Sequence, residues 1–415
     1  MTQHDSGRPA ATDRSVPDPV AEVSLRGPAE LADALPYLLG FHPDDSIVLV
    51  ALHGEAGRFG GRIRTGIPAA TGEWPAVARQ LASCLESGSV SRGGRPDGVV
   101  VFLCQDPARG EPARAVSERL RPLARSLRTA CGALGMPVFE ALCLSGGRYW
   151  SYTCPDPGCC PPEGAPAGPS GTSAMAAAAV YAGIRVRGSL REMEARLAPL
   201  GPALAEPQRR ALDAAAADLV PRMLREDRGR TAVRAETVVR ARRLMGRLRA
   251  APGGQGEGGG DTAVQDARDD ALVPPGDAAT VILGLQDRGT RDQAAEWMEG
   301  RDAPAALRLW RTLARRCVGP YREHAAAPLT LAGWVAWSTG DEAFARVAFG
   351  RALETDPGYV FAQLLHRACN EGLDPEPLRR CMREERAARR RRGARRRPRG
   401  SGGRGGGRWP DRGTG

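Results

Sequence analysis

Apolar and polar positions in the first third of the chain form two kinds of pattern. Residues 46–52 and 98–104 are continuous apolar runs rich in β-branched residues, which predicts strands buried on both faces. Residues 62–67 alternate and predict a half-exposed strand. Residues 137–144 and 148–152 predict two further strands separated by a Ser-Gly-Gly turn.

Helical spacing lies between these runs. Apolar residues recur at helical intervals in 31–39, 74–86 and 112–134, and Pro36 predicts a bend in the first of these helices. Strands that alternate with helices over short connections are typical of an α/β domain. We therefore expect residues 22–153 to form a mostly parallel sheet with helices on both faces.

The composition changes after this domain. Residues 154–173 are rich in Cys, Pro and Gly and predict an irregular loop, and residues 174–250 predict a helical segment. Residues 251–276 are Gly-rich and are expected to be a flexible linker. Residues 277–381 predict a helical domain.

One part of this helical domain has a specific pattern. Residues 326–359 resemble a single tetratricopeptide repeat (TPR), a helical hairpin of about 34 residues, although Leu329 and Ala336 stand at its usual Trp and Tyr positions. One repeat cannot build a concave groove, so a packing hairpin is favoured over a peptide-binding surface. The pattern is carried by Gly333, Gly340, Asp341, Ala345, Phe349, Ala352, Leu353, Asp356 and Pro357.

Charge is distributed unevenly along the chain. Both ends, residues 1–21 and 382–415, are polar and predicted to be disordered. From Arg379 to the end there are 15 Arg against three acidic residues, whereas the net charge of the whole chain is +11. The remainder is therefore close to neutral, and the predicted tail is an Arg/Gly-rich polycation.

The cellular compartment is predicted from two features that the sequence pattern lacks, a signal peptide and a membrane span. The first 19 residues contain no apolar stretch of signal-peptide type, and no run of about 18 apolar residues predicts a membrane span. Ten Cys without such a signal favour reduced thiols. The sequence predicts a cytoplasmic protein without a membrane partner.

Several segments together resemble a known family: SLRGP (24–28), YLLGF (37–41), PDDSIVLV (43–50), RYWSY (148–152), CPDPGCCPPEG (154–164) and the 340–359 pattern. The chain is similar, over about residues 22–375, to an actinobacterial family of uncharacterised proteins, domain of unknown function 4192. This resemblance implies a cytoplasmic actinobacterial protein of the same layout. It supplies no activity, substrate or catalytic residues.

A cysteine cluster is the first candidate site. Cys154, Cys159 and Cys160 lie on one Pro/Gly-rich loop, and Cys104 or Cys143 would be needed as a fourth ligand for Zn²⁺. Paired CxxC motifs are missing, and adjacent cysteines make awkward co-ligands. Packing of the loop is favoured over a zinc site, and a redox pair is a third reading.

The second candidate is the crevice beyond the carboxyl ends of the strands, where open parallel sheets bind ligands. We expect it to be lined by Asp106, Ser145, Arg148 and Trp150, and Arg148 and Trp150 are suited to an anionic or planar ligand. On the same argument His53, Glu55 and Gln105 would also face it. No GxGxxG motif follows a predicted strand, and no GxxxxGK(S/T) motif is present. Ordinary loop polarity explains the same residues.

Residues 42–46 (His-Pro-Asp-Asp-Ser) include the side chains of a hydrolase. In a parallel sheet they would lie at the opposite end from the crevice, so a turn is favoured over a catalytic role.

The tail is the third candidate, as a nucleic-acid-binding segment. A flexible polycation neutralises phosphates with little sequence preference. A solubilising extension without a dedicated partner is the alternative. The residues concerned are Arg389, Arg390, Arg391, Arg392, Arg395, Arg396 and Arg397.

These features favour a non-catalytic binding or scaffold protein whose partner is an unidentified protein or small molecule. An enzyme, for example a hydrolase, acting in the strand-end crevice is the first alternative. A nucleic-acid-associated protein that uses its tail is the second.

Overall fold

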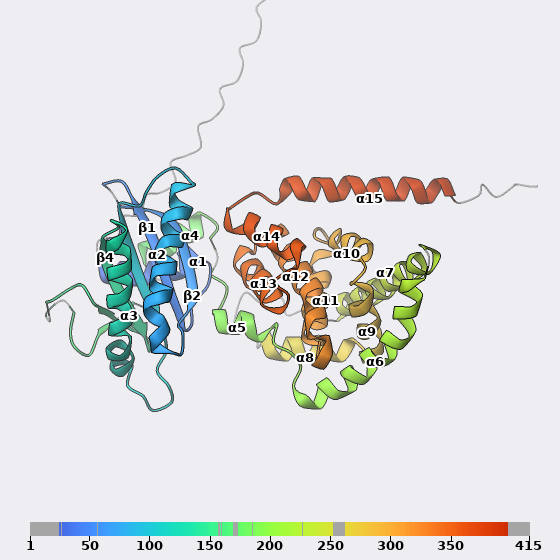
Figure 1. Cartoon of the computed structure of the whole chain (residues 1–415), viewed down its shortest axis with the longest axis horizontal. Coiled ribbons are helices and arrows are strands. Elements are labelled where there is room, and N and C mark those ends of the chain that lie inside the picture. The colour runs from blue at the N-terminus through green and yellow to red at the C-terminus, as the bar shows by residue number, and fades with distance from the viewer. Residues whose placement is uncertain are drawn as a thin grey trace, which may run out of the picture. The chain divides into compact units, whose positions relative to one another are not determined.

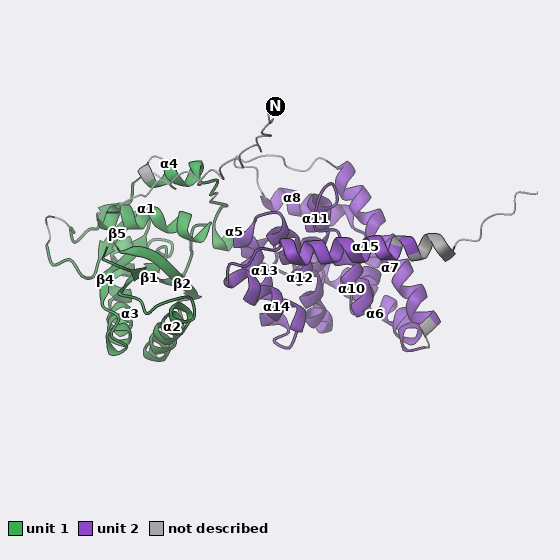
Figure 2. Cartoon of the chain, turned by 90° about the horizontal axis from the view of Figure 1, so that it is seen from above, with its two compact units in different colours: residues 1–191 green, residues 192–415 purple. Residues whose placement is uncertain are grey.

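A computed structural model of the chain describes residues 25, 27–55, 57–156, 158, 160–168, 173–184, 186–225, 227–251 and 262–396. The chain divides into two compact units, residues 1–191 and 192–415 (Figure 2).

Unit 1 is built on one six-stranded sheet in the order β2-β1-β3-β4-β5-β6. Only β3 and β4 are parallel neighbours, and the other pairs are antiparallel. The predicted mostly parallel sheet is therefore wrong: the sheet is mixed and mostly antiparallel. Its strands are β1 (Ser46–His53), β2 (Arg58–Gly66), β3 (Gly98–Cys104), β4 (Val138–Ser145), β5 (Arg148–Ser151) and β6 (Ala165–Pro166).

The length of the connections explains this topology. Residues 54–57 join β1 to β2, which is too short for the crossover that parallel strands need. Helix α2 (Trp74–Val90) instead connects β2 to β3, which run in the same direction with β1 between them in the opposite direction. The helix-containing connection therefore joins strands that are not neighbours in the sheet.

Helices cover both faces of this sheet, as predicted (Figures 1 and 2). On one face lie α2 and α3 (Ala113–Ala133), and on the other α1 (Pro28–Leu39) and α4 (Ala174–Tyr181). Alternate residues of the central strands, such as Leu49 and Val101, pack fully buried against α2 and α3. The 3₁₀ helix η1 (Thr71–Glu73) directly precedes α2.

Unit 2 is entirely helical in the part that the structure describes. The predicted helical blocks 174–250 and 277–381 are not separate here, because α6 and α7 pack against α9 and α11. The helices are α5 (Leu190–Ala195, which begins in unit 1), α6 (Pro202–Leu224), α7 (Asp227–Ala250), α8 (Thr262–Leu272), α9 (Pro275–Gly284), α10 (Arg288–Ala295), α11 (Ala303–Arg315), η2 (Gly319–Ala325), α12 (Ala326–Ser338), α13 (Glu342–Thr355), α14 (Val360–Asn370) and α15 (Glu376–Arg396).

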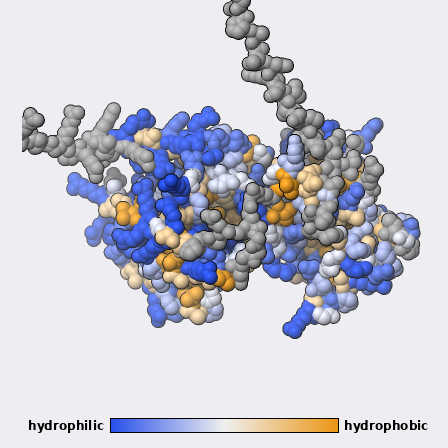
Figure 3. Space-filling view, turned by 180° about the vertical axis from the view of Figure 1, so that it is seen from behind, coloured by the Kyte–Doolittle hydropathy of each residue, from blue (hydrophilic) through white to orange (hydrophobic). Residues whose placement is uncertain are grey.

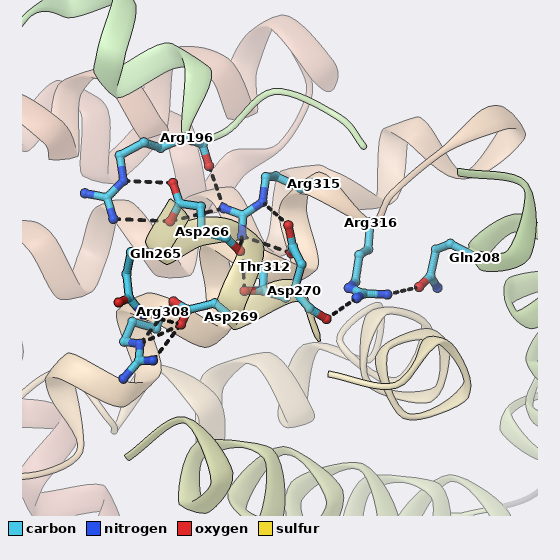
Figure 4. Close-up of polar contacts among 10 residues, drawn as sticks. All are labelled: Arg196, Gln208, Gln265, Asp266, Asp269, Asp270, Arg308, Thr312, Arg315 and Arg316. Carbon is cyan, nitrogen blue, oxygen red and sulfur yellow. Dashed lines mark hydrogen bonds and ion pairs between the residues drawn. The ribbon is translucent and has the colours of Figure 1, made fainter. Parts of the chain in front are cut away.

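Helix α8 lies within the predicted flexible linker 251–276, so that prediction is wrong for its second half. Three of its carboxylates hold it in place through two arginines of α11 and one from the turn after α5 (Figure 4). Asp269, whose side chain is 1% exposed, pairs with Arg308 of α11 at 2.5 Å. Asp270 pairs with Arg315 at 3.0 Å, and Asp266 with Arg196 at 3.1 Å.

Helices α12 and α13 pack against each other within residues 326–359. Gly333 lets them approach, since a Cβ atom there would lie 2.6 Å from the Phe349 ring. Gly340 takes a left-handed φ of 83°, and Asp341 caps α13 by accepting a hydrogen bond from the Phe344 amide. Gly333, Gly340 and Asp341 thus each take part in the packing or the turn of this helix pair, and its likeness to a tetratricopeptide repeat stays a prediction.

Helix α15 continues to Arg396, so the predicted disordered tail 382–415 is helical in its first part. No helix among the described residues is long and apolar enough to cross a membrane. On the face shown in Figure 3, hydrophilic residues predominate and hydrophobic ones lie in small groups.

Candidate functional site

The antiparallel direction of β1 determines which loops meet at one edge of the sheet. Ser46, the first residue of β1, lies opposite Cys104, the last residue of β3. The parallel neighbour β4 also ends at this edge, with Ser145. The 42–45 segment therefore meets Gln105 and Asp106, contrary to the expectation that they lie at opposite ends.

A cleft of about 460 Å³ opens at this edge, within unit 1. Its size falls in the range of small-molecule sites. Its floor is formed by the ends of β3 and β4, and one wall by α1. Its polar and titratable lining residues are Asp33, Tyr37, His42, Asp44, Cys104, Gln105, Asp106, Ser145 and Arg148.

Backbone contacts with the 186–191 segment fix the His42 side of the cleft. The amide of His42 donates to the carbonyl of Gly188 at 3.0 Å, and the Leu190 amide donates to the His42 carbonyl at 2.9 Å. The carboxylate of Asp44 accepts the Arg191 amide at 2.8 Å. The wall is therefore built from segments about 150 residues apart in sequence.

Asp106 is oriented by the turn between β4 and β5. Its carboxylate accepts a hydrogen bond from the Gly146 amide at 3.0 Å. Gly146 and Gly147 have φ values of 55° and 73°, as a two-residue hairpin turn with the twist of its strands requires. The Ser-Gly-Gly turn predicted from sequence thus also positions a carboxylate.

Ser145 stands out among the lining residues. It is 3% exposed, and its hydroxyl has no hydrogen-bond partner in the described part of the chain. A buried hydroxyl without a partner is unfavourable by about 1–3 kcal/mol. Such a group in the lining of a cleft is suited to a hydrogen bond with a bound molecule.

The lining of the cleft carries more acidic than basic side chains. Burial is the main reason that the pKa of the Cys104 thiol is raised well above its ordinary value, and the charges of Cys143, Asp44 and Asp106 raise it further. Three carboxylates line the cleft against one guanidinium, that of Arg148. This charge favours a cationic ligand over the anionic one expected from the sequence.

Two predicted ligand-binding residues serve another purpose. Arg148 lines the cleft, but its Nε and Nη2 donate to the carbonyl of Gly164 at 3.2 and 2.8 Å, and Nε also to Glu163. Trp150 is 7% exposed in the core beneath α2 and α3, and its indole donates to the Pro162 carbonyl at 3.1 Å. The predicted clamp of Arg148 and Trp150 therefore fastens the 162–164 loop.

His53 and Glu55, which were expected at the crevice, lie at the other end of the sheet. His53 is paired with Arg58 across the β1–β2 hairpin, and Leu52 lies opposite Gly98, the first residue of β3. The error has the same cause as the misplacement of His42 and Asp44, namely the direction of β1.

The cysteine cluster is only partly described. Cys154 and Cys160 are half-buried free thiols, and Cys159 lies outside the described residues. Cys143 is fully buried in the α2/α3 core, and burial raises its pKa to about 11. Among the residues that the structure describes, no three His, Cys, Asp or Glu side chains are grouped to hold a metal. Zinc at Cys154, Cys159 and Cys160 stays a prediction.

The predicted nucleic-acid-binding arginines fall at the end of α15. Arg389 pairs with Glu296 at 2.7 Å, whereas Arg391 is exposed. The side chains of Arg390, Arg392, Arg395 and Arg396 lie outside the described residues, as does Arg397.

Unit 1 is thus a mixed α/β domain with a ligand-sized acidic cleft, and unit 2 is a helical domain. The chain belongs to the family described as "Domain of unknown function (DUF4192)", which it matches over residues 28–376. No curated protein and no solved structure matches it.

Proposed function

We propose that unit 1 is a non-catalytic domain that binds a small cationic ligand, such as one with an amine or guanidine group, in the cleft at the β3 and β4 ends. The observation that carries this proposal is the buried, unpartnered Ser145 hydroxyl in a cleft that Asp44 and Asp106 also line. A hydroxyl and two carboxylates are hydrogen-bond acceptors suited to an ammonium or guanidinium group.

The remaining capacity of the carboxylates supports a ligand of this charge. Asp44 accepts one backbone amide and Asp106 another. A carboxylate has about four lone-pair sites, so each retains acceptor capacity for a ligand. The cleft is large enough for a molecule of small-metabolite size.

Binding is favoured over hydrolysis because the described residues of the cleft include no nucleophile paired with a base. A hydrolase needs a serine hydroxyl within hydrogen-bond reach of a base. In the described part of the chain, the Ser145 hydroxyl neither donates a hydrogen bond to His42 or the carboxylates nor accepts one from them. His42 and Asp44 nevertheless lie in the same cleft, so turnover is the competing outcome.

Isothermal titration with agmatine, putrescine and the anion malonate tests the proposal. We expect one of the two cations to bind and malonate not to bind. Asp106→Asn keeps an acceptor for the Gly146 amide and removes the charge. We expect it to weaken binding about 10- to 100-fold, as for loss of a charge-assisted hydrogen bond.

Asp97→Asn is the matched control. Asp97 accepts the Gly54 amide at 2.7 Å at the opposite end of the sheet, so it has the same residue type and the same kind of bond. Equal loss in both variants, or preference for malonate, would contradict the proposal. Consumption of a ligand that stops in Ser145→Ala would instead indicate an enzyme.

For unit 2 we propose a scaffold role in which the α12–α13 hairpin is a single TPR-like packing element. The packing between the two helices supports this, because the Phe349 ring of α13 occupies the space beside Gly333 of α12. We also propose an actinobacterial origin and a cytoplasmic location, on the family resemblance and the reduced thiols.

A further inference from the structure

Helix α15 is attached to unit 2 by one face that is almost entirely basic. Arg379, Arg383, Arg386 and Arg389 recur at helical spacing and point toward the segment 296–302. That segment supplies Glu296, Glu299 and Asp302, again spaced about one turn apart. We call these three carboxylates the acidic stripe.

The contacts along the stripe are ion pairs. Glu299 Oε2 lies 2.9 Å from Arg379 Nη2 and 2.8 Å from Arg383 Nη1. Asp302 lies 3.6 Å from Arg386, and buried Glu296 lies 2.7 Å from Arg389. Partial burial opposes ionisation of Glu299, but hydrogen bonds from its two arginines outweigh it and lower its pKa.

Apolar packing contributes little to this attachment. No described side chain of α15 is fully buried, whereas the neighbouring helix α14 buries Ala362, Leu365 and Cys369. Ion pairs between partly exposed groups, as at Glu299 and Asp302, each contribute about 0–1 kcal/mol and weaken as salt is added. Most contacts that hold the docked helix are therefore sensitive to salt.

Among the described side chains of α15, the exposed charged ones are Arg380, Glu384, Glu385 and Arg391. Two are positive and two are negative, so together they add no net charge. The arginines that pair with the acidic stripe are therefore the described positive groups that docking conceals.

We propose that the acidic stripe masks the arginine face of α15 and competes for it with the phosphate backbone of a nucleic acid. The four arginines span about 15 Å along the helix and offer regularly spaced cations to a regularly spaced polyanion. A membrane surface fits less well, because α15 has no apolar face to insert. This inference is independent of the cleft in unit 1.

Fluorescence anisotropy with a labelled oligo-dT of about 20 nucleotides tests the competition on the full chain. We expect Glu299→Gln with Asp302→Asn to bind about fivefold more tightly than the wild type, because three arginines of α15 lose their ion pairs with the acidic stripe. Arg379 and Arg383 keep their ion pairs with Glu376 of the same helix. Arg249 of α7, which also pairs with Asp302, is released as well. The control is Glu354→Gln with Glu371→Gln. It breaks two surface ion pairs of unit 2, with Arg351 and Arg367, and changes the net charge equally.

Equal affinities of the stripe and control variants would overturn the proposal, as would no binding by any of the proteins at about 50 mM salt. Amide hydrogen exchange of the wild-type protein is a second test, which needs no variant. Exchange of α15 amides should accelerate as salt is raised, while that of α12 amides stays slow. Protection of α15 that is insensitive to salt would also overturn it.

Discussion

Ser46 lies directly opposite Cys104 in the antiparallel pairing of β1 with β3. This one relationship brings the His42–Asp45 segment, Asp106 and Ser145 to the same edge of the sheet. It also sends His53 and Glu55 to the other edge. The candidate ligand cleft exists because of the direction of a single strand.

A disulfide can report this direction. Directly opposed residues of antiparallel strands have Cα atoms about 4.5–5.5 Å apart, within the range for disulfide formation. In the Ser46→Cys variant, oxidation is expected to form a disulfide between the new cysteine and Cys104, detected by mass spectrometry of peptides. His53→Cys is the control, since a parallel β1 would place that residue near Cys104 instead. A link from residue 53 and none from residue 46 would show the pairing to be wrong.

The buried ion pair of Arg308 and Asp269 is expected to be essential for unit 2. Arg308→Met leaves a carboxylate that is 1% exposed without its cation. Loss of one partner from a buried pair costs about 3–5 kcal/mol, measurable by urea unfolding. Arg367→Ala breaks an ion pair with Glu371 whose arginine is 80% exposed, and no measurable change is expected there. Similar losses in both variants would disprove the role given to α8.

Close approach of α12 and α13 predicts opposite outcomes for two glycines of the same hairpin. In Gly333→Ala the added methyl meets the Phe349 ring at 2.6 Å, so a loss of about 1–3 kcal/mol is expected. Gly350→Ala has nothing within 4 Å of its added methyl and should be neutral or stabilising by up to about 1 kcal/mol. Thermal unfolding of the two variants distinguishes a packed hairpin from a loosely associated one.

Burial of Cys131 predicts a loss of stability in alkali. Burial raises the pKa of this thiol from 9.0 to about 11, so the unfolded chain loses its proton at lower pH than the folded chain does. The contribution to stability is present below pH 9 and disappears as the pH rises towards 11. Cys131→Ala should therefore flatten the dependence of the unfolding free energy on pH in this window. Cys84→Ala removes an exposed thiol and should leave the slope unchanged.

Local signals in the sequence predicted the main elements correctly. Each strand and helix expected in residues 31–152 is present within a few residues, because hydrophobic period and turn residues act over short distances. The first of these helices ends at Leu39, and Gly40 after it takes a left-handed φ of 85°. The two helices expected within 326–359 are likewise present.

The sequence predicted only some of the residues that line the cleft, and the reason is physical. Ser145, Asp106 and Arg148 follow strands and were expected to meet, whereas His42 and Asp44 were placed at the wrong end. One signal could have corrected this, namely the short 54–57 connection, which permits only an antiparallel hairpin. Trp150 was misplaced because its position on a strand does not say whether its side chain points into the helix-covered core or toward the cleft.

The sequence by itself determined the helices and strands of residues 31–152, the acidic or basic character of each segment, and the family. Those properties depend on neighbours along the chain. The tertiary structure decided the direction of β1, the formation of α8 and its pairing with arginines outside it, and the pairing of Arg389 with Glu296. These depend on contacts between residues far apart in sequence, whose partners no local pattern specifies.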